Sequence, residues 1–330
     1  MSSIHHTSSS YIVLIPAYNE ASSILRALDA IHEADKYTEK TLAKIIICVN
    51  GCTDGTTDLA RGWKKAPVTI LETPAGYARA VNRLIAHARR YYPDHIVVKT
   101  DADSQIEKHA LSRLFSQFEK HDELVVAGGH PIPTRPTTRS PYRQLLSRIL
   151  SIRSLYPLSE RAIANVERFH QYADDDPQPN IGAGEKRTKI YFHGRLWSVR
   201  AASFLRTLDA DAIGDDAFLS DWTLYTYGEK SIRVMYDANV IFIPNYSLRR
   251  HWKVYRRVTE DCQRVGSIPE LTQLQELCAL ELDWGYILTS VKKRHVPLFV
   301  AYALIKWFEN FSYAHIKYKD TYWQYREKEA

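Results

Sequence analysis

Residues 97–104 read VVKTDADS, so an apolar, largely β-branched run ends in two aspartates that stand one residue apart. The run predicts a short buried strand, and side chains alternate along a strand, so Asp101 and Asp103 are expected on the same side. Two neighbouring carboxylates offer the hard oxygen ligands that Mg²⁺ or Mn²⁺ prefers beside substrate phosphates. An isolated D-x-D pair is also compatible with a solvated turn or a helix cap, so its surroundings decide between these interpretations.

Strand and helix patterns alternate on both sides of this stretch. The candidate strands are YIVLIP (11–16), KIIICVN (44–50), VTILE (68–72), HIVVKT (95–100) and LVVAGG (124–129). Apolar residues at helical spacing fill most of the segments between them. This alternation predicts an α/β fold, with a mostly parallel sheet and helices on both faces.

Polar clusters follow three of these strands. They read PAYNE (16–20), NGCTDGT (50–56) and DADS (101–104). In a parallel sheet the carboxyl ends of the strands share one edge, and ligands bind outside that edge. The three clusters together therefore favour a ligand site over an isolated turn.

The chain divides into three parts by composition. We expect a flexible N-terminus at 1–10, a main α/β domain at 11–246 and a helical C-terminal extension at 247–330. The main domain contains an insertion at 131–189, which opens with the proline-rich PIPTRPTTRSP. Within the insertion we expect two helical segments, near 142–156 and 158–173, followed by a loop.

Bulk composition excludes several classes of protein. The chain has 330 residues, 45% of them apolar, which suits a globular protein. Its net charge of +6 suits a protein that handles phosphates, nucleic acid or an anionic membrane surface. Its four cysteines form no CxxC pair, which argues against a zinc site or a disulfide framework. No apolar run is long enough to span a bilayer, and the N-terminus has no signal-peptide pattern. We expect a cytoplasmic protein, either free or peripheral at the inner membrane face.

Residues 295–325 contain a twelve-residue apolar stretch followed by aromatic residues interleaved with lysine. Three interpretations stay open for this segment. The segment forms either a core helix packed on the main domain, an interfacial helix on an anionic membrane, or the contact face of a homodimer.

Four segments taken together resemble a known family. They read IVLIPAYNEASSILRALDAI, CVNGCTDGTTDLA, VVKTDADSQI and IGDDAFLSDWTLYTYGEKSI. In order and spacing they resemble the inverting glycosyltransferases of family 2 over about residues 11–245. The resemblance implies a GT-A fold, a nucleotide-sugar donor (UDP favoured), Mn²⁺ or Mg²⁺, and a hydroxyl acceptor that is lipid-linked, a glycan or a small molecule. It makes residues 11–246 the expected catalytic domain and places the insertion at 131–189 on the acceptor side.

The family's residue roles carry over by position. The residues implied in nucleotide-sugar binding are Pro16, Ala17, Tyr18, Glu20, Asn50, Gly76, Arg79, Asp101, Ala102 and Asp103, with Asn82 beside the glycine-rich segment. Asp103 is also the implied metal ligand. The chain departs from the family at Val49 and Asn50, where acids are usual, so the base is less certain than the sugar-transfer chemistry. For Gly76 and Arg79, an ordinary amphipathic helix is an equal alternative.

The segment IGDDAFLSDW resembles the family's Glu-Asp motif, with Asp215 in the place of the glutamate. Asp216 then matches the general base that takes a proton from the acceptor hydroxyl. Acids at a helix N-terminus are also favoured by the helix dipole alone. Gly194 in YFHGRLWSVR, together with Asp215, is implied on the acceptor and sugar side.

The basic segment LRRHWKVYRR (248–257) bears on processivity and metal binding. Processive members carry Gln-x-x-Arg-Trp here, whereas this chain has Leu248 and His251 before Trp252. The resemblance therefore implies a non-processive hexosyltransferase-type enzyme that moves one sugar, with His251 as a candidate metal ligand and Trp252 on the acceptor side.

Two other functions compete with the transferase. A non-catalytic nucleotide- or carbohydrate-binding protein on the same scaffold is disfavoured by the intact Asp101, Asp103 and Asp216. Nucleic-acid binding through residues 249–257 is disfavoured because acids at the expected cleft would repel phosphates, and no nucleic-acid motif is present.

Overall fold

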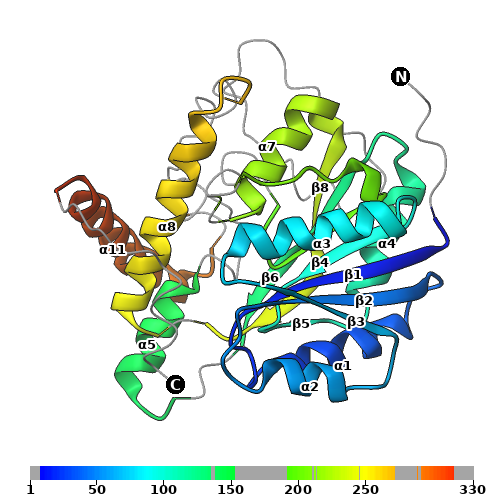
Figure 1. Cartoon of the computed structure of the whole chain (residues 1–330). Coiled ribbons are helices and arrows are strands. Elements are labelled where there is room, and N and C mark those ends of the chain that lie inside the picture. Colours follow the sequence, from blue (N-terminus) through cyan, green and yellow to red (C-terminus); the bar gives the residue numbers. More distant parts are fainter. Residues whose placement is uncertain are drawn as a thin grey trace. The chain divides into compact units, whose positions relative to one another are not determined.

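The computed structural model describes residues 8–134, 138–152, 192–209, 212, 214–244, 246–271, 288 and 291–315. By internal contacts the chain forms two compact units (Figure 1). The first comprises residues 1–131 and 191–242, and the second comprises residues 132–190 and 243–330. The expected second helix at 158–173 and the loop at 174–189 lie outside the described residues, and the expected domain boundaries stay a prediction.

A single sheet organises the first unit, with the strand order β3-β2-β1-β4-β7-β6-β8-β5 among the described residues. Its strands are β1 (Ser10–Ala17), β2 (Thr41–Asn50), β3 (Val68–Thr73), β4 (Ile96–Thr100), β5 (Ser104–Ile106), β6 (Val126–Pro133), β7 (Leu196–Val199) and β8 (Ile232–Phe242). Its helices are α1 (Ile24–Asp35), α2 (Thr56–Gly62), α3 (Tyr77–Tyr91), α4 (Ala110–Lys120) and α7 (Asp216–Tyr227), with short 3₁₀ turns η4 (Ala202–Phe204) and η5 (Glu229–Ser231).

The strands β3, β2, β1 and β4 run parallel, as the alternating pattern predicts. The sheet then continues with antiparallel pairs, because β7 pairs with both β4 and β6 in the opposite direction and β5 pairs antiparallel with β8. The segment before Pro244 forms the long strand β8. The α/β fold class is confirmed, and β4 lies between the parallel and antiparallel portions.

Helices cover both faces of the parallel strands (Figure 1). The odd-numbered apolar residues of β1, from Tyr11 to Ile15, pack in one buried cluster with apolar residues of α1 and α4. The other face of β1–β3 is covered by α3, whose buried residues recur at helical spacing. Because both faces are buried, the strands read as continuous apolar runs, and their polar residues are confined to the ends.

The second unit contains α5 (Pro141–Leu150), α8 (Leu248–Gly266), η6 (Lys293–His295) and α11 (Val296–His315). A small buried cluster joins Ile152, Val291, Phe299 and Tyr302. Ser140 and Ser247 cap α5 and α8, since each hydroxyl accepts a hydrogen bond from a backbone N–H in the first turn. In the part of the chain that the structure describes, no helix combines the length and apolar character needed to traverse a bilayer.

Candidate active site

The parallel register brings the polar clusters to one edge of the sheet, as expected. Ala17 at the end of β1 lies opposite Val49 near the end of β2. On the other side of β1, Leu14 lies opposite Lys99 of β4, and Asp101 follows the end of that strand. Most residues assigned to the nucleotide from the sequence therefore follow three neighbouring strands, β1, β2 and β4, at one edge of the sheet, and Gly76 and Arg79 follow β3.

Hydrogen bonds tie the loop after β1 to the loop after β2. Asn19, in the left-handed region at φ 52°, accepts a bond from the Thr53 N–H at 2.8 Å through its side-chain oxygen. The Ala21 N–H donates to Asp54 Oδ2 at 3.0 Å, and the Glu20 N–H donates to Thr56 Oγ1 at 2.7 Å. The two loops therefore form one connected surface.

The residues predicted to hold the base and ribose are mostly covered. Ala17 and Tyr18 are 2% and 5% exposed, Glu20 is buried, and Pro16 is half-buried. The Ser23 hydroxyl donates to Glu20 Oε2 at 2.5 Å. Ser23 stands directly before α1 and therefore orients the carboxylate of Glu20. This orientation is compatible with nucleotide binding.

Asn50 ends β2 and is buried. Its Oδ1 has no hydrogen-bond partner among the described residues. The next residue, Gly51, has φ +67°, and a Cβ there would lie 2.9 Å from the Ala75 nitrogen. The chain therefore turns sharply after Asn50 and passes directly against the segment that leads into α3.

The glycine-rich segment leads into α3, and its predicted residues differ in their contacts. Gly76, at φ 148°, caps the helix, and Arg79 is an exposed residue of its first turn that donates to the Ala75 carbonyl at 3.2 Å. Asn82 instead binds backbone, since its amide exchanges two hydrogen bonds with Leu208 at 2.8 and 2.7 Å. Arg79 is exposed, and its assignment to the donor stays a prediction, whereas the amide of Asn82 is engaged by the Leu208 backbone.

Asp101 and Asp103 are each about one-third exposed and meet a single guanidinium. Arg195 Nη1 lies 2.9 Å from Asp103 Oδ1 and 4.0 Å from Asp101 Oδ2. It also donates to Ser104 Oγ at 2.9 Å, and its guanidinium stacks 4.4 Å over the ring of Phe242. Ala102 between the acids is buried, so the acids turn to the same side while the residue between them packs inward.

Lys99 is a buried cation behind the two acids. Its Nζ lies 2.7 Å from Asp101 Oδ1 and 3.3 Å from Asp215 Oδ2, and it donates to the Gly194 carbonyl at 2.5 Å. Burial alone would lower the pKa of Lys99, but the carboxylates of Asp101 and Asp215 outweigh it and hold that pKa well above its ordinary value. Lys99 therefore stays charged and links β4 to the start of α7.

Asp215 is buried and surrounded by donors. The hydroxyl of Tyr77 donates to its Oδ1 at 2.7 Å, and the indole N–H of Trp197 donates to its Oδ2 at 3.2 Å. Burial raises the pKa of Asp215, while the charge of Lys99 opposes that rise. Burial, followed by the charge of Asp215, also raises the pKa of Tyr77, so its hydroxyl remains a donor.

Asp216 is the first residue of α7 and is only half-buried. Its Oδ2 accepts the Gly194 N–H and its Oδ1 accepts the Ala217 N–H, both at 3.0 Å. A Cβ at Gly194 would lie 3.0 Å from Asp215 Oδ1 and 3.1 Å from Asp216 Oδ2. Glycine at position 194 therefore allows the chain to approach both acids closely.

The remaining predicted residues belong to the second unit. His251 and Trp252 are in the first turns of α8. His251 Nε2 lies 3.4 Å from Glu309 Oε1, and the guanidinium of Arg256 lies 5.1 Å from the centre of the Trp252 ring. Their assignments to metal and acceptor stay predictions.

Oxygen donors, rather than histidine or cysteine, dominate the β4 end, which fits Mg²⁺ or Mn²⁺. Among the described residues, no group of three or more His, Cys, Asp or Glu side chains is arranged to share a metal ion. The acids fit a metal that takes most of its ligands from a diphosphate and water, with Asp103 as a protein ligand.

Three residues of this site were absent from the sequence-based predictions, namely Lys99, Tyr77 and Arg195. Each stands close in sequence to a predicted residue, but each also contacts a carboxylate that is distant in sequence. Of these three residues, the sequence indicates only Lys99, which stands inside the apolar run VVKT, because a buried lysine requires an acidic partner.

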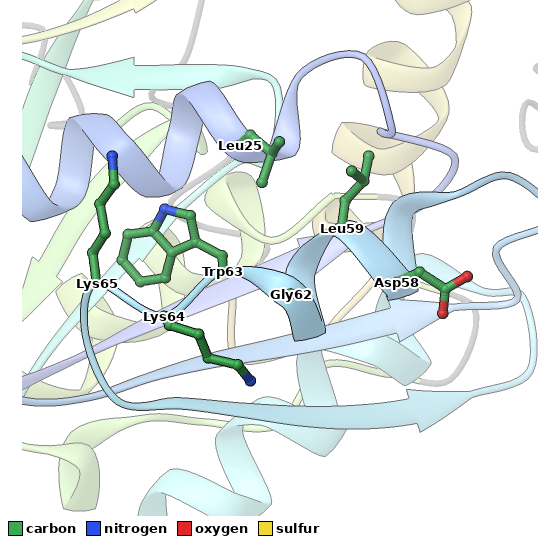
Figure 2. A pocket seen from close by; sticks show the side chains of 7 residues that line it. All are labelled: Leu25, Asp58, Leu59, Gly62, Trp63, Lys64 and Lys65. Carbon is green, nitrogen blue, oxygen red and sulfur yellow. The ribbon is translucent and has the colours of Figure 1, made fainter.

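A separate hollow of about 520 Å³ lies at the surface of α1 and α2 (Figure 2). Its lining residues are Leu25, Asp58, Leu59, Gly62, Trp63, Lys64 and Lys65. The indole of Trp63 donates to Asp29 Oδ1 at 2.8 Å, and Lys65 reaches the same oxygen at 2.8 Å. These contacts hold the ring in place, and none of the predicted site residues lines the hollow.

Comparison with known proteins identifies the class. Residues 12–176, half of the chain, match the family model of glycosyl transferase family 2, and the chain therefore belongs to that family of glycosyltransferases. None of the curated proteins matches the chain.

The family match and one solved structure confirm the GT-A fold. The mannosyltransferase PcManGT from Pyrobaculum calidifontis, in complex with GDP-Man and Mn²⁺, superposes with a TM-score of 0.52 and 17% identity, over 93% of this chain and 76% of that one. Glucosyl-3-phosphoglycerate synthase from Mycobacterium tuberculosis, in complex with Mn²⁺ and UDP-Glc, gives a TM-score of 0.49 and 17% identity, over 79% and 80% of the two chains.

Proposed function

We propose that this glycosyltransferase moves a single sugar from a nucleotide-sugar to an acceptor hydroxyl, with inversion at the anomeric carbon and Asp216 as the general base. The observation that carries the proposal is the linkage of the two acidic motifs through Lys99, which contacts Asp101 after β4 and Asp215 beside α7. Residues assigned to the donor and the residue assigned to the acceptor proton thereby belong to one connected site.

The contrast between Asp215 and Asp216 supports the choice of base. Asp215 is buried, and Tyr77, Trp197 and Lys99 occupy its oxygens. Asp216 is half-buried at the helix start and accepts only backbone N–H groups in the contacts described above. A base must reach the proton that it removes, so the more accessible carboxylate suits that role.

In the proposed reaction, the loops after β1 and β2 hold the nucleotide, and Arg79 and Arg195 face its phosphates. Asp216 takes the proton from the acceptor hydroxyl as that oxygen bonds to the anomeric carbon and the sugar–phosphate bond breaks. A single displacement from the opposite face inverts the configuration. When bound at Asp103, a divalent metal would offset the charge of the departing diphosphate.

The donor base is the open part of this proposal. UDP is the expectation from the sequence, whereas the structural neighbour PcManGT was solved with GDP-Man and Mn²⁺. Asn50 at the end of β2, with its unpaired buried Oδ1, is the side chain best suited to select the base, because an amide both donates and accepts.

Thermal-shift measurements with UDP, GDP, dTDP and CDP, each with and without Mn²⁺, test the proposal. A ligand that binds the folded state raises the melting temperature, so one nucleotide with Mn²⁺ is expected to give a shift that Asp103→Ala removes. Asp237→Ala, an exposed acid of β8, is the matched control and is expected to keep the shift. A nucleotide shift that is independent of Mn²⁺ and of Asp103 would favour the alternative, a non-catalytic nucleotide-binding protein on this scaffold.

A further inference from the structure

One face of α11 exposes large apolar side chains. Val300, Leu304, Trp307, Phe308 and Phe311 are 46–67% exposed, and they recur at the three- and four-residue spacing of one helix face. We call these five residues the α11 face. The rings of Trp307 and Phe311 stack with their centres 6.0 Å apart, so these two side chains form one continuous aromatic surface on the α11 face.

The opposite face of α11 is already used for packing. Phe299 and Tyr302 are buried in the cluster that includes Ile152 and Val291. Within the second unit α11 contacts both α5 and α8 (Figure 1). The helix is therefore apolar on both sides, and burial of the α11 face would require either a rearrangement of the unit or an external apolar environment.

Charge is almost absent from the exposed positions of this helix. Between residues 296 and 312 the other exposed positions are Pro297 and Asn310. Glu309 is 2% exposed and lies beside His251, and Lys306 places its ammonium 3.9 Å from the centre of the Tyr255 ring. No exposed acid interrupts the α11 face.

A basic cluster directly precedes this helix. Lys292, Lys293 and Arg294 are consecutive and exposed, and they lead into the first turn of α11. The whole chain carries a net charge of +6. An apolar face that contains tryptophan and follows three consecutive exposed cations has the composition of a helix that lies at the surface of an anionic bilayer.

We propose that the α11 face rests in the interfacial region of an anionic lipid bilayer, with Lys292, Lys293 and Arg294 at the headgroups. The helix would lie along the membrane plane, because its other face remains packed on α5 and α8. The aromatic side chains would enter the acyl boundary, where the amphipathic indole of Trp307 is favoured. This attachment is independent of the proposed transfer reaction, although it would bring the enzyme to a surface where membrane-borne acceptors are found.

Charge favours a lipid surface over a second copy of the chain as the occupant. A self-complementary interface would place each basic cluster beside a second copy of α11, and the exposed residues of that helix between 296 and 312 include no acid. An anionic bilayer offers negative charge to all three cations.

Cosedimentation of the full chain with vesicles tests the proposal. Vesicles of phosphatidylcholine alone are compared with vesicles that also contain phosphatidylglycerol, at low and high salt. We expect binding to the anionic vesicles, weakened by salt. Leu304→Gln/Trp307→Gln should weaken it by roughly tenfold, and reversal of Lys292 and Lys293 to glutamate should weaken it by roughly fivefold for each charge removed.

The controls distinguish membrane binding through the α11 face from non-specific binding through other exposed aromatic residues and from misfolding of the variants. Tyr91→Gln and Tyr225→Gln change residues of the first unit that are 56% and 53% exposed, and both should leave vesicle binding unchanged. Circular dichroism and melting temperature confirm that each variant is folded, and the single variants Leu304→Gln and Trp307→Gln replace the double variant if it is not.

Three outcomes would overturn the proposal. They are absence of binding to anionic vesicles, binding that the α11 substitutions leave unchanged, and a dimer in sedimentation velocity that Leu304→Gln/Trp307→Gln dissociates. The last result would assign the α11 face to a second copy of the chain. Loss of nucleotide binding in the same variants is not expected, so vesicle binding and the transferase proposal fail separately.

Discussion

Arg195 Nη1 lies 2.9 Å from Asp103 Oδ1, so the acid proposed to bind a divalent metal already contacts a cation. The guanidinium stacks over the ring of Phe242, and its Nη1 also lies 4.0 Å from Asp101 Oδ2. A metal at Asp103 must therefore share that carboxylate with Arg195 or displace it.

Substitution Arg195→Gln is expected to increase the affinity for Mn²⁺ alone, because it removes a like charge from the site. The ion pair is partly exposed, so the expected gain is roughly fivefold. Titration of Mn²⁺ followed by electron paramagnetic resonance measures it without nucleotide. Arg113→Gln, which breaks an exposed pair with Asp237, is the control, and equal or weaker Mn²⁺ binding by Arg195→Gln would contradict the competition.

Lys99 is expected to be essential for stability. Lys99→Met leaves the buried carboxylate of Asp215 without its cation, and removal of one partner from a buried pair costs about 3–5 kcal/mol in the free energy of unfolding. Urea denaturation measures the loss, and Asp215→Asn in the Lys99→Met background should recover part of it. Lys65→Met removes an exposed pair with Asp29 and should change stability by less than about 0.5 kcal/mol. A similar small loss for Lys99→Met would show that the buried ion pair is not formed.

Gly194 is expected to tolerate no side chain. A Cβ at this position would crowd carboxylate oxygens of both Asp215 and Asp216, so Gly194→Ala must displace them. We expect a stability loss of about 1–3 kcal/mol and a fall in transfer rate of roughly tenfold to a hundredfold. Gly62→Ala, where a Cβ would meet nothing within 4 Å, should do neither. Equal behaviour of the two variants in the rate measurement would mean that the turn at Gly194 does not position the acids.

Asp54 is expected to make the nucleotide loops sensitive to acid. Burial raises the pKa of Asp54, but hydrogen bonds from Thr56 and the Ala21 N–H outweigh it and leave that pKa below its ordinary value of 3.8. The carboxylate therefore contributes stability above pH 3.8 that is lost as the pH falls through the lowered pKa. Asp54 is exposed, so the contribution is about 0.5–1 kcal/mol.

The measurement is urea denaturation of wild type and Asp54→Asn between pH 3 and pH 7. The difference in unfolding free energy should be largest near neutral pH and should decrease as the pH falls below 3.8. A difference that grows on acidification would have the wrong sign and would contradict the lowered pKa.

The sequence predicts the parallel part of the fold well because its information is local. The runs at β1 and β4 are continuous and apolar, and polar residues follow directly at the shared edge. The position of Asp101 and Asp103 at that edge of the sheet could therefore be predicted from the sequence. The family resemblance added Asp216 through the IGDD segment.

The remaining site depends on contacts that are distant in sequence. Lys99 meets Asp215, and Arg195 reaches back to Asp103, only because β7 inserts antiparallel between β4 and β6. The hydrophobic pattern of a four-residue strand does not predict whether the strand runs parallel or antiparallel to its neighbours. Asn82 shows the converse case, since a residue that fits a donor-binding pattern is engaged by the Leu208 backbone.

The assignment of Asp216 is tested most directly by comparing Asp216→Asn with Asp215→Asn. Release of nucleoside diphosphate from UDP-glucose and GDP-mannose is measured with Mn²⁺, together with nucleotide-induced thermal shifts. Asp216→Asn should keep the melting temperature and the nucleotide shift but lose turnover by at least about a hundredfold. Asp215→Asn should lower the melting temperature, because Lys99 then loses a buried partner. Full turnover by a folded Asp216→Asn protein would show that another group removes the acceptor proton.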